Sequence, residues 1–129
     1  MAFGTATVLT SLGRAVTTNR IKGAGTEPSY VGIGVGATGA ARTAVVADTA
    51  LSTAVESRVA GTSTQQTTST TNDTYQVVGT VTATASRSVD EAGLFDASTA
   101  GNMYLSATFP VVSLNSGDSI QATLKVQYS

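Results

Sequence analysis

The side chains that most often carry out hydrolysis are only partly represented in this chain. Serine is abundant, but histidine is absent, so the commonest general base near neutral pH is missing. A Ser-Lys pair needs a lysine that is shielded from water, and the chain has only Lys22 and Lys125. Lys125 falls on the water-facing side of a predicted strand. The sequence therefore predicts no catalytic residue and a protein that is not an enzyme.

A glycine-rich segment, Gly34-Val35-Gly36-Ala37-Thr38-Gly39, has the spacing of a dinucleotide-binding fingerprint and follows a predicted strand. That site also requires a helix whose N-terminus faces the pyrophosphate, and a second parallel strand that ends in an acidic residue. Downstream, the chain shows hairpin patterns rich in serine and threonine instead. We expect close packing or a turn at these glycines, and no bound cofactor.

Three carboxylates, Asp90, Glu91 and Asp96, cluster in one short segment, and paired carboxylates can bind a hard cation or exchange protons. Adjacent strand residues point to opposite faces, so Asp90 and Glu91 cannot line one site. No segment has the ligand spacing of a calcium-binding hand. We expect solvated charges and capped turns here, and no metal site.

The seven basic residues are scattered, and few aromatic residues lie among them. Phosphate backbones are bound by concentrated positive surfaces, so we expect no nucleic-acid partner. No stretch is long and apolar enough to cross a membrane, and no secretory signal is recognisable. We therefore expect no membrane partner, and assembly in the cytoplasm.

The composition favours a single domain that associates with other proteins. A chain of 129 residues with 41% hydrophobic residues can bury one core, so residues 1–129 are expected to form one domain. Only 12% of residues are charged and the net charge is -1, which gives weak electrostatic protection against self-association. We expect a homo-oligomer, either a trimer or a dimer. Without cysteine, no disulfide stabilises it.

The pattern near the N-terminus predicts an extended arm over residues 1–10 and a short helix over 11–22. The helix follows from apolar residues at three- and four-residue spacing, from Thr10 or Ser11 as an N-cap and from Gly23 as a stop. The arm shows no capping pattern. Its apolar residues Phe3, Val8 and Leu9 could dock on a neighbouring protein or on the chain's own sheet.

Most of the remaining chain has the patterns of strands. Residues 119–128 alternate apolar and polar without a break, which is typical of a half-buried antiparallel strand. A long hairpin is predicted over 58–85, turning at Asn72-Asp73. Further strands are predicted at 30–35, 89–95 and 103–109, and Pro110 is predicted to end the last of these. The predicted fold is therefore mainly β, an antiparallel sandwich or jelly-roll-like domain.

The first half of the hairpin is almost wholly hydroxyl and amide, which is typical of an edge strand or a projecting ribbon that a partner can pair with. The candidate partner contacts are Phe3, Val8 and Leu9 of the arm and Gln65, Gln66, Asn72 and Tyr75 of the ribbon. The apolar residues of the later strands should form the core, with Phe95 at its centre; they are Leu94, Phe95, Met103, Leu105, Phe109 and Val111.

Several segments of the chain resemble small structural proteins of tailed bacteriophages. They are GTEPSYVG (25–32), DTAL (48–51) with Glu56 to Arg58, the hairpin, and EAGLFDASTAGNMYLSATFPVV (91–112). The resemblance implies a β-rich virion component without catalytic residues. It implies a capsid decoration (cement) protein that binds the major capsid protein, or alternatively a tail-fibre, collar or head-tail junction protein that binds tail or portal proteins. The small size favours decoration of the capsid.

Overall fold

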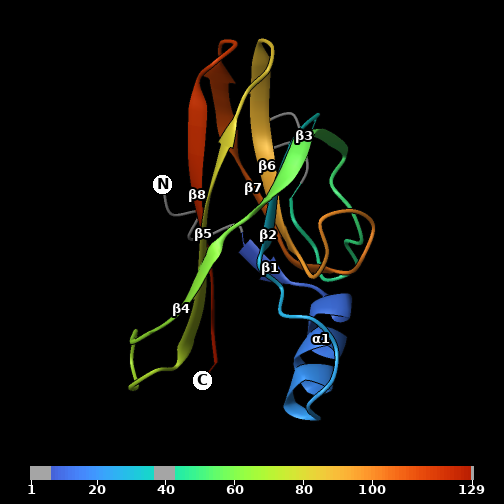
Figure 1. Cartoon of the computed structure of the whole chain (residues 1–129), viewed down its shortest axis with the longest axis vertical. Coiled ribbons are helices and arrows are strands. Elements are labelled where there is room, and N and C mark those ends of the chain that lie inside the picture. Colours follow the sequence, from blue (N-terminus) through green and yellow to red (C-terminus); the bar gives the residue numbers. More distant parts are fainter. Residues whose placement is uncertain (1–6, 37–42, 129) are drawn as a thin grey trace.

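The computed structural model describes residues 7–36 and 43–128. The strands form two antiparallel sheets that pack as a sandwich (Figure 1), in the orders β1-β7-β6-β2-β3 and β4-β5-β8. This confirms the predicted mainly β sandwich with one short helix. In chain order the elements are β1 (Thr7–Leu9), α1 (Ser11–Ile21), β2 (Tyr30–Val35), β3 (Thr53–Ala60), β4 (Thr62–Gln66), β5 (Thr74–Thr82), β6 (Arg87–Phe95), β7 (Met103–Leu114) and β8 (Ser119–Gln127).

The hydrophobic core lies between the two sheets. On β8, Ile120, Ala122 and Leu124 are buried and the intervening residues are exposed or half-buried, which confirms the predicted alternation. Gly79 allows β5 to approach β2, because a Cβ there would lie 2.7 Å from a methyl group of Val31. The largest fully buried residues of this core include Val31, Ile33, Val77, Leu94, Leu105 and Leu124.

A second apolar cluster surrounds Phe95 on the opposite face of the five-stranded sheet. Phe95 is buried but is not part of the core between the sheets. Glycines give its ring space, because a Cβ at Gly93 or at Gly32 would lie 2.8 or 3.3 Å from Phe95 Cε2. The Arg58 guanidinium covers the ring at 3.4 Å from its centroid. The predicted burial of Phe95 is confirmed, but its predicted place at the core centre is wrong, because strand alternation points Leu94 inward instead.

The predicted hairpin over 58–85 exists only from β4 onward. β3 pairs with β2 in the five-stranded sheet, whereas β4 pairs with β5 in the other sheet. The chain changes sheets at Gly61, whose N–H donates to the Ser29 carbonyl at 2.7 Å. A Cβ at Gly61 would lie 2.5 Å from a methyl group of Val77, so a larger residue does not fit at this crossing.

The hairpin ends in a loop of residues 67–73, so the predicted tight turn at Asn72-Asp73 is wrong. The Asp73 carboxylate accepts the backbone N–H groups of Thr68, Ser69 and Thr70 at 2.8, 3.0 and 2.9 Å. The bond from Thr70 contributes most to holding the pKa of Asp73 well below its ordinary value. Asn72 adopts the left-handed conformation, with a φ of 61°. One carboxylate therefore organises the tip of the hairpin.

β7 continues through Pro110, so the prediction that a strand ends at this proline is wrong. The register of β6 and β7 shifts between Val89, opposite Val112, and Glu91, opposite Thr108. Proline is tolerated at such a bulge because no regular ladder bond is lost there. Beyond the bulge Val111 is 50% exposed, so its predicted place in the core is also wrong.

Two carboxylates that were predicted to be solvated are buried. Asp90 and Glu91 are 2% and 0% exposed. Glu91 occupies the space left by Gly34, where a Cβ would collide with Oε1, and this oxygen accepts the Thr53 N–H at 3.3 Å. The predicted close packing is thus confirmed at Gly34, because the missing side chain makes room for a carboxylate. Residues 37–42 of the glycine-rich segment lie outside the described residues.

The helix α1 confirms the prediction over 11–22 to within one residue. Thr10 caps it: its hydroxyl accepts the Gly13 N–H at 2.9 Å and donates to the Met103 carbonyl. A Cβ at Gly13 would collide with the Tyr104 carbonyl, so this glycine lets α1 lie directly against β7. Among the described residues, no helix is long and apolar enough to cross a membrane.

The β5–β6 and β7–β8 turns lie at the same end of the sandwich (Figure 1) and are hydrogen-bonded to each other. The Ala83 N–H donates to the Asp118 carbonyl at 2.8 Å, and the Gly117 N–H donates to the Ala83 carbonyl at 2.8 Å. The Ser116 hydroxyl donates to the Thr84 carbonyl at 3.2 Å. We call this the closed end.

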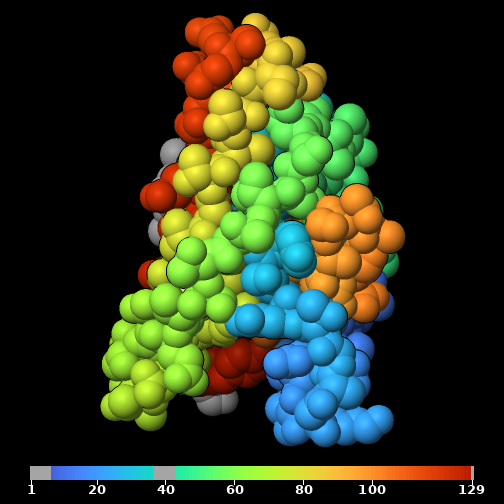
Figure 2. Space-filling model, in the orientation of Figure 1, coloured from blue at the N-terminus to red at the C-terminus, as the bar shows by residue number. Residues whose placement is uncertain are grey.

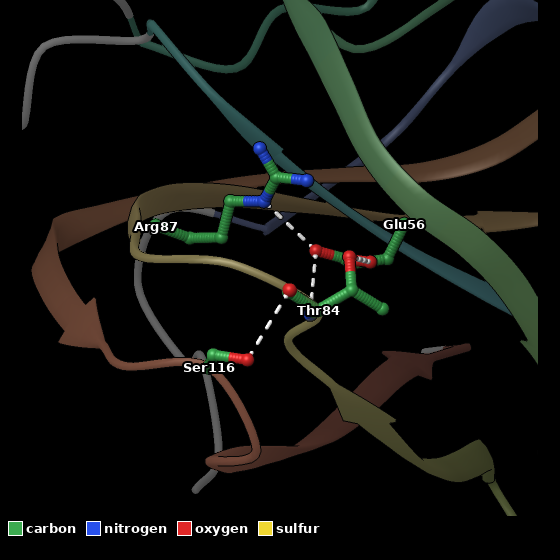
Figure 3. A network of polar contacts seen from close by, with 4 residues as sticks. All are labelled: Glu56, Thr84, Arg87 and Ser116. Carbon is green, nitrogen blue, oxygen red and sulfur yellow. Dashed lines mark hydrogen bonds and ion pairs between the residues drawn. The ribbon is translucent and has the colours of Figure 1, made fainter.

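Glu56 ties β3 to the closed end (Figure 3). It sits in a bulge of β3 with a φ of 61°. Its carboxylate accepts Arg87 Nε at 2.8 Å, the Thr84 N–H at 3.1 Å and the Thr84 hydroxyl at 2.8 Å. The bond from Arg87 and then those from Thr84 lower the pKa of Glu56 to about 2. The left-handed backbone thus aims a carboxylate that links β3 to β6 and to the β5–β6 turn.

Candidate functional site

The other end of the sandwich is open. There α1 and the β4–β5 hairpin project side by side (Figure 1), and Figure 2 shows a hollow between them with the end of β8 at its floor. This hollow has a volume of about 500 Å³, within the range of natural binding pockets. We call it the tyrosine groove; its lining residues are Val16, Thr17, Arg20, Ile21, Glu27, Pro28, Gln65, Tyr75, Tyr104 and Tyr128.

Three hydroxyl groups meet at the floor of the tyrosine groove. The hydroxyls of Tyr104 and Tyr128 are hydrogen-bonded to each other. The Thr17 hydroxyl lies 3.2 Å from that of Tyr104 and 3.0 Å from that of Tyr128. Because Thr17 belongs to α1, Tyr104 to β7 and Tyr128 follows β8, this cluster links three elements of the open end.

Tyr75 connects the groove wall to the loop before β2. Its hydroxyl donates to the Pro28 carbonyl at 2.8 Å and to Glu27 Oε1 at 3.1 Å. Its ring lies 6.0 Å from that of Tyr104, centroid to centroid, within the range of favourable aromatic pairs. Burial, followed by the Glu27 charge, raises the pKa of Tyr75, and burial raises that of Tyr104. Both phenols therefore stay neutral at physiological pH.

The rim of the groove is apolar with one charge of each sign. Ile21 is 81% exposed, so the rim carries an apolar side chain in contact with solvent. The Arg20 guanidinium donates to the Gly25 carbonyl at 2.8 Å, and Glu27 holds the Tyr75 hydroxyl. The lining residues include no pairing of an activated nucleophile with a base. The chemistry of the groove therefore suits binding by apolar contact and hydrogen bonds.

Two of the seven predicted contact residues lie in the tyrosine groove. Gln65 of β4 and Tyr75 of β5 both line it, so the structure brings together two residues of the predicted ribbon. Gln66 is exposed on β4, where its amide donates to the Thr64 hydroxyl at 2.9 Å. Asn72 is exposed in the hairpin loop.

The predicted arm is partly built into the fold. Thr7–Leu9 form β1, in which Val8 pairs with Ser106 and Leu9 with Leu105 of β7. Leu9 also packs against the core. These two residues therefore dock on the chain's own sheet, which was one of the two expected outcomes. Phe3 lies outside the described residues, and its role stays a prediction.

Sequence reasoning missed two of the three tyrosines in the groove. Tyr75 is near the start of β5, Tyr104 is near the start of β7 and Tyr128 follows the end of β8. Because β5 and β8 are antiparallel, with Tyr75 opposite Val126, the start of one strand lies beside the end of the other. Pairing the predicted strands by direction would have brought Tyr75 and Tyr128 to the same end of the molecule.

Comparisons with known proteins found no matching family model, no similar curated protein and no similar solved structure. Within the described residues, no group of three or more acidic, histidine or cysteine side chains could hold a metal ion.

Proposed function

We propose that this protein is a non-enzymatic structural component of a tailed-bacteriophage virion, a decoration (cement) protein that binds the major capsid protein and stabilises the shell. The observation that carries the proposal is the tyrosine groove, which is open, aromatic and flanked by two projecting elements. The resemblance of the sequence to phage structural proteins supplies the virion context.

The open end has the properties of a protein-docking surface. Tyrosine is enriched at protein interfaces, because its ring packs while its hydroxyl stays hydrogen-bonded. The groove presents Tyr75 and Tyr128 beside the exposed Ile21, so a loop of a capsid subunit can bury apolar area there. Each contact of this size is modest. Repeated across a symmetric shell, such contacts act together, since releasing a bridging molecule requires breaking several at once.

Sedimentation with empty shells of the phage that encodes this chain tests the proposal. Ile21→Glu places a charge at the groove rim without disturbing a buried residue, and we expect it to reduce shell occupancy by about tenfold or more, as for a charge placed in an interface centre. Val111→Glu is the matched control, because Val111 is also an exposed aliphatic residue, 50% exposed, but does not line the groove. Equal binding of both variants and the unchanged protein would overturn the docking surface.

The number of copies per particle distinguishes the capsid from the alternative location. A decoration protein is present in numbers that match the capsid subunits. A tail-fibre, collar or head-tail junction protein is present in a few copies at one vertex. Quantitative gel analysis of purified particles therefore supports decoration if the ratio to the capsid subunit is near one, and supports the alternative if only a few copies are found.

A further inference from the structure

The two sheets have four edge strands, and three of them carry features that prevent pairing with another chain. β1 is only three residues long. β3 is interrupted by the bulge at Glu56 and carries the charges of Glu56 and Arg58. β8 presents the exposed Lys125 near its C-terminal end.

The fourth edge strand, β4, has none of these features. Its sequence, Thr62-Ser63-Thr64-Gln65-Gln66, contains no charge and no proline, and its register with β5 is regular throughout. Among the described strands, β5 is its only partner. One edge of β4 therefore presents backbone N–H and C=O groups to solvent in the geometry of a strand that can be extended.

We propose that β4 pairs with β4 of a second copy of this chain, antiparallel about a two-fold axis, so that two three-stranded sheets become one of six strands. An uncharged strand suits this occupant, because self-pairing places every side chain beside a copy of the same short segment and a charged residue would repel itself. The low net charge of -1 adds little repulsion between copies.

A two-fold axis at the centre of β4 pairs the whole strand with its copy. With Thr64 at the centre of the five residues, it faces Thr64 of the second copy, and Thr62 faces Gln66. Facing threonines are a favourable cross-strand pair. Five residues bury far less area than a standard stable interface. The dimer is therefore weak in solution and forms mainly where copies are concentrated, as on a shell.

The absence of cysteine makes a cross-linking test specific. Facing residues of an antiparallel pair have Cα atoms about 4.5–5.5 Å apart, a separation that a disulfide spans without movement of the backbone. We expect Thr64→Cys to form a disulfide-linked dimer, in oxidised glutathione buffer, at least about tenfold faster than the control Thr80→Cys, because pairing raises the effective thiol concentration. Thr80 is exposed on β5 of the same sheet.

Sedimentation equilibrium on the cysteine-free chain completes the test. We expect concentration-dependent dimers that are abolished by Thr64→Lys, with an unchanged circular dichroism spectrum. Equal cross-linking rates for the two cysteine variants, or a dimer that Thr64→Lys leaves intact, would overturn the proposal. A chain that stays monomeric at millimolar concentration would also overturn the proposal. These experiments contain no shells, so a negative result would not bear on the proposed docking of the tyrosine groove on the capsid.

Discussion

The closed end and the open end of the sandwich use their polar groups in opposite ways. At the closed end, Thr84 and Arg87 both donate to the Glu56 carboxylate, and two turns exchange backbone bonds. At the open end, the hydroxyls are paired at the groove floor, while Ile21 on the rim is left in solvent. The difference indicates that polar contacts join the connecting turns at the closed end, whereas the open end leaves apolar surface in solvent.

The largest expected effect on stability comes from Phe95, which does not line the tyrosine groove, and it sets the scale for the comparison of the two ends. Phe95→Ala removes a fully packed ring that the Arg58 guanidinium covers, so we expect a loss of about 3 to 5 kcal/mol in the free energy of unfolding. Urea denaturation measures it. A loss below about 1 kcal/mol, the size expected for a surface site, would show that the Phe95 cluster does not contribute to the folded state.

The wall of the open end depends on one buried cap. Thr10→Ala removes the acceptor for the Gly13 N–H and the bond to the Met103 carbonyl, so we expect a loss of about 1 to 2 kcal/mol. Thr10→Ser keeps the hydroxyl and is the control. If both variants unfold at the same denaturant concentration, the cap does not hold α1 on the sheet.

The closed end should lose its contribution in acid. The pKa of Glu56 is about 2 in the folded protein against an ordinary value of 4.5. The carboxylate therefore stabilises the fold fully above pH 4.5, and this contribution is lost as the pH falls from 4.5 toward 2. We expect Glu56→Gln to be less stable than the unchanged protein at pH 7 and to converge with it near pH 2. Parallel stability curves for the two proteins would contradict the role of the ion pair.

The smallest expected effect on stability comes from the open end. Tyr128 is 44% exposed, so Tyr128→Phe should cost about 0.5 kcal/mol or less, as for an exposed hydrogen bond. Tyr30→Phe is the control, since Tyr30 lies outside the groove lining. A loss as large as that of Phe95→Ala would erase the distinction between the two ends, because the groove would then be part of the structural core.

The features that could be predicted from the sequence are local. The alternation of β8 and the capped helix each depend on residues that are neighbours along the chain, and both are confirmed. The burial of Phe95 followed from its residue type, but its side of the sheet did not, because that depends on which strands pair.

The features that could not be predicted depend on contacts between distant segments. The change of sheet at Gly61 depends on Val77, and the passage of β7 through Pro110 depends on a bulge opposite β6. The burial of Glu91 requires the space left by Gly34. The tyrosine groove requires α1, β5, β7 and β8 to meet, so sequence reasoning found only Gln65 and Tyr75 of its lining residues.

Electron cryomicroscopy of decorated particles tests the central claim most directly, because it shows which end of the molecule meets the shell. We predict density for many copies over the whole capsid, with α1 and the β4–β5 hairpin against the capsid subunits and the closed end directed to solvent. Copies whose closed end contacts the capsid, or particles whose shell carries no density for this protein, would contradict the central claim.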